Sequence, residues 1–128
     1  MIVDSSAIIA ILRNEPDAGA MIEALQQASV RRISAVTYVE AAVVADNDRH
    51  PVLSRRLDEL VRNAQMRIEP VTAGQAQIAR QAYRDFGKGR HKAGLNLGDC
   101  FAYALAKEMD EPLLFKGDDF RHTDIEPI

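Results

Sequence analysis

The chain opens with the stretch MIVDSSA at residues 1–7. Its apolar residues end in the carboxylate of Asp4, and Ser5 or Ser6 can then cap a helix that runs to about Arg13. The stretch therefore predicts a short buried strand that leads directly into a helix. Asp4 is a candidate site residue, because a carboxylate at the end of a buried strand is costly unless it is paired or binds a cation. Its structural alternative is a cap on the next helix, which Ser5 and Ser6 could provide without it.

The rest of the chain continues this alternation of strand and helix patterns. Strands that alternate with helices predict a mostly parallel sheet with helices on both faces. We therefore expect a single α/β domain over residues 1–128, layered as an α/β/α sandwich. The further strands are expected at 31–35, 66–71 and 113–115, and the further helices at 18–28, 37–45, from 51, at 72–86 and from 96 to the stop at Pro112.

Composition indicates an ordinary soluble chain. Of 128 residues, 47% are hydrophobic and 27% charged, while aromatics make up only 5%, so the core must consist mainly of Ala, Val, Ile and Leu. The single cysteine cannot form an internal disulfide. No basic leader precedes the first strand, and no apolar stretch approaches the roughly 20 residues that span a bilayer. We expect a cytoplasmic protein.

Three further acidic positions follow separate segments of the chain. They are Glu40, Asp99 and the pair Asp118 and Asp119. In open parallel sheets, ligands bind outside the carboxyl ends of the strands. Acids that converge there with Asp4 would form a cation site, and oxygen ligands favour Mg²⁺ or Mn²⁺.

These acids also have structural explanations. TYVE at residues 37–40 matches a capping box, in which Glu40 would reach back to the backbone of Thr37. Asn96 can cap the next helix, and an acid such as Asp99 in its first turn favours the helix dipole. The acidic pair at 118–119 can form a turn. The set as a whole supports a site, since independent caps need not all fall at one edge of the sheet.

Other chemistries have less support in the sequence. His50, His91 and His122 are far apart, and none has a metal-ligand partner three or four residues away. Neither a zinc site nor a mechanism with paired histidines is therefore indicated. Cys100 is typical of a small buried residue, and the chain has no Walker loop or dinucleotide-binding fingerprint.

The charge distribution is uneven. A net charge of −3 and an isoelectric point of about 5.6 argue mildly against nucleic-acid binding. Positive charge is nevertheless concentrated in one segment, interrupted only by Asp85. This segment is either a solvated helix end with a flexible loop or a phosphate-binding arm, and some of its charges are also expected to balance the acids. It contains Arg80, Arg84, Lys88, Arg90, His91 and Lys92.

In order along the chain, these motifs resemble those of PIN-domain proteins, specifically the VapC toxins of bacterial toxin–antitoxin pairs. MIVDSSA resembles the start of that family, and the motifs TYVE and LGDC, at 37–40 and 97–100, resemble those that carry its second and third acids. Residues 112–120 resemble its closing strand and aspartate–phenylalanine turn. GKGRH at 87–91 and GLN at 94–96 resemble one branch of these toxins, so the likeness covers the whole chain.

The resemblance implies a Mg²⁺- or Mn²⁺-dependent endoribonuclease. Asp4, Glu40 and Asp99 would hold one or two ions, with Ser6 as a supporting polar group. Glu40 would hold the attacking water or act as its base. Attack by water should leave a 5′-phosphate and a 3′-hydroxyl, and the basic segment would position the RNA.

The fourth acid departs from the family pattern. Many members carry a Thr and an Asp two residues apart after the last strand, where this chain has Phe115 and Gly117. The fourth acid must then be Asp118 or Asp119, or be absent. We favour Asp119.

The resemblance also implies a homodimer and a cognate VapB-type antitoxin. Such a partner is expected to lay a helix and tail over the apolar face of the early helices and to insert an arginine near the acids. The candidate contacts, each of which can equally be core, are Ile9, Leu12, Val43 and Val44.

Two other interpretations stay open. One is a non-catalytic PIN-like module that binds RNA or a protein partner, for which the only support is the missing acid at Gly117. The other is a DNA nuclease or phosphatase on the same fold. A phosphatase with an aspartyl nucleophile would need a second Asp two residues after Asp4, where this chain has Ser6.

Overall fold

The computed structural model describes residues 1–128 and contains a four-stranded sheet, six α-helices and one short 3-10 helix. No helix in the fold has both the length and the apolar character needed to span a bilayer. In chain order the elements are β1 (Ile2–Val3), α1 (Ser5–Leu12), α2 (Ala18–Gln27), β2 (Arg32–Ser34), α3 (Ala35–Asp46), α4 (Val52–Asn63), β3 (Arg67–Glu69), α5 (Ala73–Phe86), α6 (Leu97–Met109), β4 (Leu113–Leu114) and η1 (Asp119–His122).

The sheet has the strand order β3-β2-β1-β4, and every neighbouring pair is parallel. The predicted mostly parallel sheet is therefore confirmed. Parallel neighbours require crossover connections, which the pairs α1–α2, α3–α4 and α5–α6 supply. Because β1 lies between β2 and β4, the residue that follows β1 lies in the middle of the carboxyl edge. That residue is Asp4.

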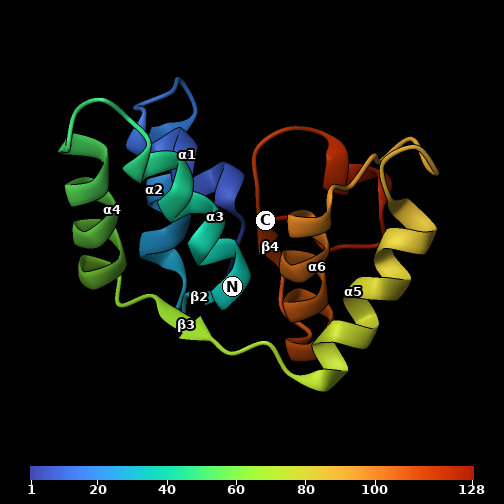
Figure 1. Ribbon diagram of the computed structural model, residues 1–128. Helices are drawn as coiled ribbons and strands as arrows, with labels where there is room; N and C mark the ends of the chain where they lie inside the picture. The colour runs from blue at the N-terminus through green and yellow to red at the C-terminus, as the bar shows by residue number, and fades with distance from the viewer.

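Two hydrophobic cores lie on opposite faces of the sheet. Ile2 and its register partner Leu113 belong to the core formed with α5 and α6. The next pair, Val3 and Leu114, belongs to the core formed with α1 to α4. Alternation along a strand sends successive side chains to opposite faces, and Figure 1 shows the two groups of helices on either side of the sheet. The α/β/α layering is thus confirmed.

Two helices begin differently from the sequence prediction. Asp4, rather than Ser5 or Ser6, is the N-cap of α1. Helix α3 begins at Ala35, because the side chain of Ser34 at the end of β2 accepts a hydrogen bond from the backbone N–H of Val36 at 3.3 Å. The next residues are therefore already inside the helix, and the capping box predicted for residues 37–40 is wrong.

The cap predicted at Asn96 is confirmed, and it is part of a full capping box at the start of α6. Asn96 Oδ1 accepts from the backbone N–H of Asp99 at 2.9 Å, and Asp99 Oδ2 accepts from the backbone N–H of Asn96 at 3.0 Å. These reciprocal bonds satisfy two backbone donors at the start of the helix. They also fix the side chain of Asp99 to the first turn of α6.

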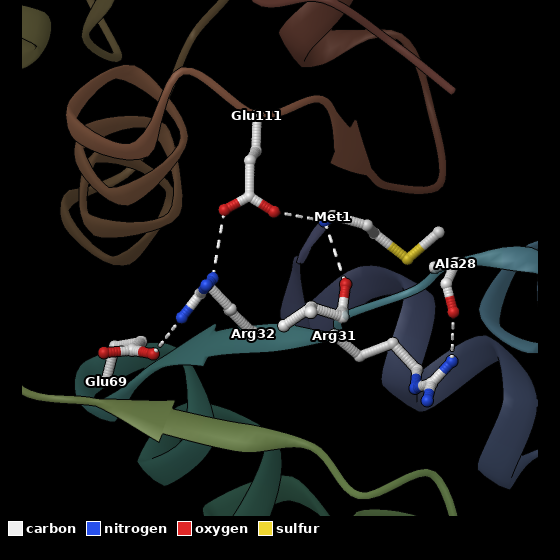
Figure 2. A network of polar contacts seen from close by, with 7 residues as sticks. Met1, Ala28, Arg31, Arg32, Glu69 and Glu111 are labelled. Atoms are coloured by element: carbon white, nitrogen blue, oxygen red, sulfur yellow. Dashed lines mark hydrogen bonds and ion pairs between the residues drawn. The ribbon is translucent and has the colours of Figure 1, made fainter.

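A network of charged groups connects the four strands (Figure 2). The carboxylate of Glu111, just before β4, accepts hydrogen bonds from the amino group of Met1 and, at 3.0 Å, from Arg32 Nε. Arg32 Nη1 also bonds Glu69 at the end of β3, at 2.7 Å. The amino group of Met1 further donates to the carbonyl of Val30 at 3.0 Å. All four strands are therefore connected: β1, β2 and β4 at their amino ends, and β3 through the side chain of its last residue.

Candidate active site

Asp4 is the most buried acid at the carboxyl edge, with 2% of its surface exposed. Its Oδ2 accepts hydrogen bonds from the backbone N–H of Ser6 at 3.0 Å and from Ser6 Oγ at 2.6 Å. Its Oδ1 is buried and has no hydrogen-bond partner. Burial raises the pKa of Asp4 above its usual 3.8, although the bonds from Ser6 oppose this effect. One oxygen of Asp4 is therefore held, and the other is free to bind a ligand.

Glu40 approaches the same edge from α3. Its Oε1 is also buried without a hydrogen-bond partner, although the residue as a whole is half-buried. Burial, followed by repulsion from Asp4 and Asp99, raises the pKa of Glu40 from 4.5 to about 7. Glu40 does not cap a helix, so no hydrogen bond within the fold explains the position of its carboxylate.

Asp99 has both a structural and an electrostatic role. It closes the capping box of α6, and it also lies close enough to Asp4 and Asp119 to be repelled by both. Burial is the largest influence and raises the pKa of Asp99 from 3.8 to about 6, against the lowering effect of the Asn96 backbone N–H. The capping explanation is therefore correct but incomplete.

The two acids after β4 are placed differently. Asp118 is exposed and lies 3.6 Å from Arg121 in an ion pair. Asp119 is also exposed, but its charge raises the pKa of both Asp4 and Asp99. The chain reaches this position through Gly117 at φ +93°, a left-handed conformation that a side chain would strain. The turn thus accounts for the glycine and directs Asp119, rather than Asp118, toward the other acids.

Ser6 links Asp4 to the segment that follows β4. Its hydroxyl donates to Asp4 and accepts from the backbone N–H of Lys116 at 3.0 Å. The side chain of Lys116 forms ion pairs with Glu15 and, at 3.5 Å, with Asp17. Sequence reasoning missed Lys116, because a backbone N–H is present at nearly every residue and carries no sequence signal.

The basic segment lies at the same end of the α5–α6 pair as Asp99, since it connects α5 to the start of α6 (Figure 1). None of its arginines or lysines forms an ion pair, so the expectation that they balance the acids is wrong. These side chains are exposed and project from the outer surface of α5 and the loop. Asp85 is bonded instead by Gln81 at 2.9 Å.

His91 differs from the other members of this segment. Its Nδ1 accepts from the backbone N–H of Ala93 at 3.0 Å, and its ring lies edge-on against Phe86, with centroids 5.2 Å apart. The ring is therefore half-buried and holds the loop together. Of the six residues predicted to bind phosphate, His91 is the one with a clear structural role.

The acidic site has the chemistry of a divalent-cation site. All its side-chain donors are carboxylate oxygens, and two of these oxygens, Asp4 Oδ1 and Glu40 Oε1, are buried and unpaired. Hard divalent cations prefer such ligands. The carboxylates repel one another, and no three acidic, cysteine or histidine side chains already surround a common point. The residues present fit a cation that would draw them together.

An apolar groove of about 1010 Å³ adjoins the acids. It runs between α1 and α3, and Ser6, Glu40 and Lys116 line its edge. Val39 and Val43 in this groove are 55% and 52% exposed, which is unusual for large aliphatic side chains. Ile9, Val43 and Val44 line it as expected, but Leu12 is buried in the core and is unavailable to a partner.

Removal of the Glu40 charge should stabilise the protein at alkaline pH in the presence of chelator. The pKa of Glu40 is higher in the folded state, so its contribution to stability is present below about pH 4.5 and is lost as the pH rises through about 7. We expect Glu40→Gln to raise the free energy of unfolding by about 1–2 kcal/mol near pH 8, after discounting for solvent screening, and to have no effect near pH 4.5.

Urea denaturation across this pH range measures the difference. Glu59→Gln on the exposed face of α4 is the matched control, and should change nothing at either pH. If the Glu40→Gln variant were no more stable than the parent near pH 8, the inferred repulsion of Glu40 by Asp4 and Asp99 would be contradicted.

Comparisons with known proteins identify the family and the fold. The sequence model of the PIN domain matches residues 1–126. VapC ribonuclease Mb0625 of Mycobacterium bovis is 58% identical over 127 residues, which cover 98% of this chain and 96% of that protein. Ribonuclease VapC42 of Mycobacterium tuberculosis is 49% identical over 128 residues, covering 99% and 98%.

Solved structures show the same fold at low sequence identity. VapC20 of Mycobacterium tuberculosis, described as a sarcin–ricin-loop-cleaving toxin, superposes with a TM-score of 0.76 at 15% identity and covers 99% of this chain and 97% of that one. VapBC2 of Rickettsia felis, bound to a promoter DNA fragment, gives a TM-score of 0.78 at 12% identity, covering 99% and 96%. With full-length relatives near 50% identity and the family model matching almost every residue, this chain belongs to the VapC branch of the PIN-domain family.

Proposed function

We propose that this protein is a metal-dependent endoribonuclease and the toxin of a toxin–antitoxin pair. The observation that carries the proposal is the pair of buried, unpaired carboxylate oxygens, Asp4 Oδ1 and Glu40 Oε1, at the carboxyl edge of a parallel sheet. Unsatisfied buried polar atoms are uncommon in folded proteins and call for an explanation. The VapC ribonucleases to which the chain is similar support RNA as the substrate.

Asp4, Glu40 and Asp99 would hold Mg²⁺ or Mn²⁺, with Asp119 as the fourth acid. When bound, such an ion supplies Lewis-acid activation of water and offsets charge on the phosphate. Ser6 holds one oxygen of Asp4, so the other is oriented into the site. The capping bonds hold Asp99 in the same way.

Glu40 is the residue best suited to take a proton from the attacking water. Burial and the neighbouring carboxylates raise its pKa to about 7 without metal, and a bound cation would lower it again, so that Glu40 would be ionised and able to accept a proton at neutral pH. No hydrogen bond fixes its Oε1, so this oxygen is available to a water molecule. Attack by water on the phosphorus, with departure of the 3′-oxygen, would leave a 5′-phosphate and a 3′-hydroxyl, without a cyclic phosphate.

The RNA would reach the acids along the basic segment. Arg80, Arg84, Lys88, Arg90 and Lys92 are exposed and unpaired, and their loop ends beside the first turn of α6. Lysine and arginine side chains of this kind bind the phosphate backbone without reading sequence. The scarcity of aromatic residues for base stacking favours recognition of RNA shape and of unpaired loops.

Loss of the Asp99 charge should abolish cleavage without loss of the fold. Asparagine at this position keeps an oxygen that can accept from Asn96, so Asp99→Asn removes a charge and leaves the capping bond. Purified protein with cellular RNA and Mg²⁺ or Mn²⁺ should give discrete fragments with 5′-phosphates. We expect the Asp99→Asn variant to cleave at least about 100-fold more slowly and chelator to stop cleavage.

The control for this experiment is Asp118→Asn, because Asp118 is exposed and faces Arg121 rather than the site. It should cleave as the parent does. Full activity of Asp99→Asn would refute the assignment of the acids. Metal binding without cleavage of any tested RNA would favour the binding-module interpretation, and a preference for DNA would favour the DNA nuclease.

Loss of one arginine of the basic segment should weaken RNA binding uniformly. In an inactive Asp99→Asn background, Arg84→Ala should flatten the slope of log affinity against log salt concentration by about one unit, since one phosphate contact is lost. Titrations of fluorescent RNA at several salt concentrations measure the slope. Arg56→Ala on the exposed face of α4 serves as the control, and an unchanged slope for Arg84→Ala would exclude backbone contact by this segment.

The apolar groove between α1 and α3 is the proposed site of a VapB-type antitoxin. Its exposed valines suit the apolar face of a partner helix, and Glu40 at its edge would attract an arginine from that partner. The solved structures of similar fold include a toxin–antitoxin complex of Klebsiella pneumoniae. A homodimer, which the family likeness also implies, would need a separate surface.

A charge placed in this groove should prevent antitoxin binding but leave cleavage intact. We expect Val43→Asp to weaken binding of the co-expressed antitoxin by about 100-fold, because the carboxylate would be buried in an apolar contact. Val52→Asp, at a similarly exposed valine on α4, is the control. Calorimetry measures affinity, and sedimentation measures the oligomeric state. If Val43→Asp instead abolished a homodimer and left the antitoxin affinity unchanged, the groove would be the contact surface for a second copy of this chain.

A further inference from the structure

Gly98, the second residue of α6, lies directly against the carboxylate of Glu40. A Cβ atom at Gly98 would overlap both carboxylate oxygens of Glu40. A side chain at position 98 and the present position of Glu40 therefore exclude each other. The carboxylate of Glu40 occupies the space that any other residue at 98 would fill.

The backbone of Gly98 does not itself require glycine. It is absent from the positive-φ glycines, which are Gly89, Gly94 and Gly117. Two other helices also carry glycine at their second position, and a Cβ at neither position would meet an overlap like that at Gly98. Nothing lies within 4 Å of a Cβ at Gly19 in α2, and at Gly74 in α5 the nearest atom, 3.2 Å away, is the end of the Glu108 side chain. Alanine is a better helix former than glycine, so helix propensity would favour a side chain at position 98. Only the overlap with Glu40 disfavours one.

Glu40, rather than the helix, would yield to a side chain at position 98. The start of α6 is held by the reciprocal bonds of its capping box. Glu40 is held by no side-chain bond, is repelled by Asp4 and Asp99, and lines the open groove between α1 and α3. A larger residue at 98 would therefore turn the carboxylate of Glu40 into the groove, away from the other acids.

We propose that Gly98 is a positioning residue, whose missing side chain lets the Glu40 carboxylate lie on the first turn of α6, within reach of the cation that Asp4 and Asp99 hold. This inference rests on the proposed metal site. It adds a residue that contacts neither metal nor RNA but determines whether the third carboxylate joins the site.

The test is a double-mutant cycle between positions 98 and 40. The variants are Gly98→Ala, Glu40→Ala and the double variant, with Gly19→Ala as the matched control at the second position of α2. Three readouts are taken: Mn²⁺ affinity by calorimetry on the metal-free protein, the melting temperature in chelator, and RNA cleavage. The first two do not depend on catalytic activity.

We expect Gly98→Ala to weaken Mn²⁺ binding about 10-fold and cleavage about 100-fold, approaching the effect of Glu40→Ala, because a small displacement of a reacting group is costly. In the Glu40→Ala background, Gly98→Ala should cause no further loss in either readout. In that background it should also raise the melting temperature, as Gly19→Ala does in the parent, since the carboxylate no longer obstructs the new methyl group.

The proposal would be overturned if Gly98→Ala weakened Mn²⁺ binding and cleavage equally in the parent and in the Glu40→Ala variant, since the glycine would then act through a residue other than Glu40. Unchanged Mn²⁺ affinity in Gly98→Ala would also overturn it. If Gly98→Ala does not fold, recovery of folding in the double variant would support the contact, and failure of both would refute it. If the parent protein cleaves no RNA, the proposed function fails, but the Mn²⁺ cycle still decides the role of Gly98.

Discussion

The candidate site depends on a constraint of the fold, which holds carboxylates together at one edge of a parallel sheet against their mutual repulsion. Asp4, Glu40, Asp99 and Asp119 come from separate segments, and their charges raise one another's pKa values or those of their neighbours. No cation of the protein pairs with Asp4, Glu40 or Asp99. The fold nevertheless keeps the first three together. Hydrogen bonds from Ser6 hold Asp4, the capping bonds of α6 hold Asp99, and the missing side chain at Gly98 leaves room for Glu40.

The charged network that connects the four strands shows how the fold treats acids that are structural. There Glu111 binds the amino group of Met1 and Arg32, and Glu69 binds Arg32 (Figure 2). Every carboxylate in that network has a cation within bonding distance, and the pKa of Glu111 is held below its usual value of 4.5 although burial opposes this. The contrast between this network and the candidate site is the clearest structural argument that the unpaired acids serve a ligand from outside the chain.

Two surfaces of different character lie next to the elements that carry these acids. The basic segment connects α5 to the start of α6, which carries Asp99 (Figure 1), and the apolar groove between α1 and α3 is lined in part by Glu40. Glu40 belongs to both, since it lines the groove and lies on the first turn of α6. An occupant of the groove would therefore contact the residue that the proposed chemistry needs. Under the proposed function, binding of a protein partner and inhibition of cleavage would be consequences of the same geometry.

Most of the fold and part of the site could be predicted from local patterns in the sequence. The order of strands and helices, the parallel sheet and the cap at Asn96 follow from periodicity and capping, which act over a few residues. The prediction of the start of α3 failed because two local signals competed. Ser34 and Thr37 both suit a helix start, and the helix begins at Ser34, directly after β2, so that Glu40 has no capping role.

The sequence by itself determined which acids follow which strands, because secondary structure is local. Only the tertiary structure decided that Asp119 rather than Asp118 faces the others, that Lys116 supports Ser6 and that Gly98 admits Glu40. These are contacts between residues 58 to 115 positions apart or turns whose direction depends on packing, and no local pattern encodes them.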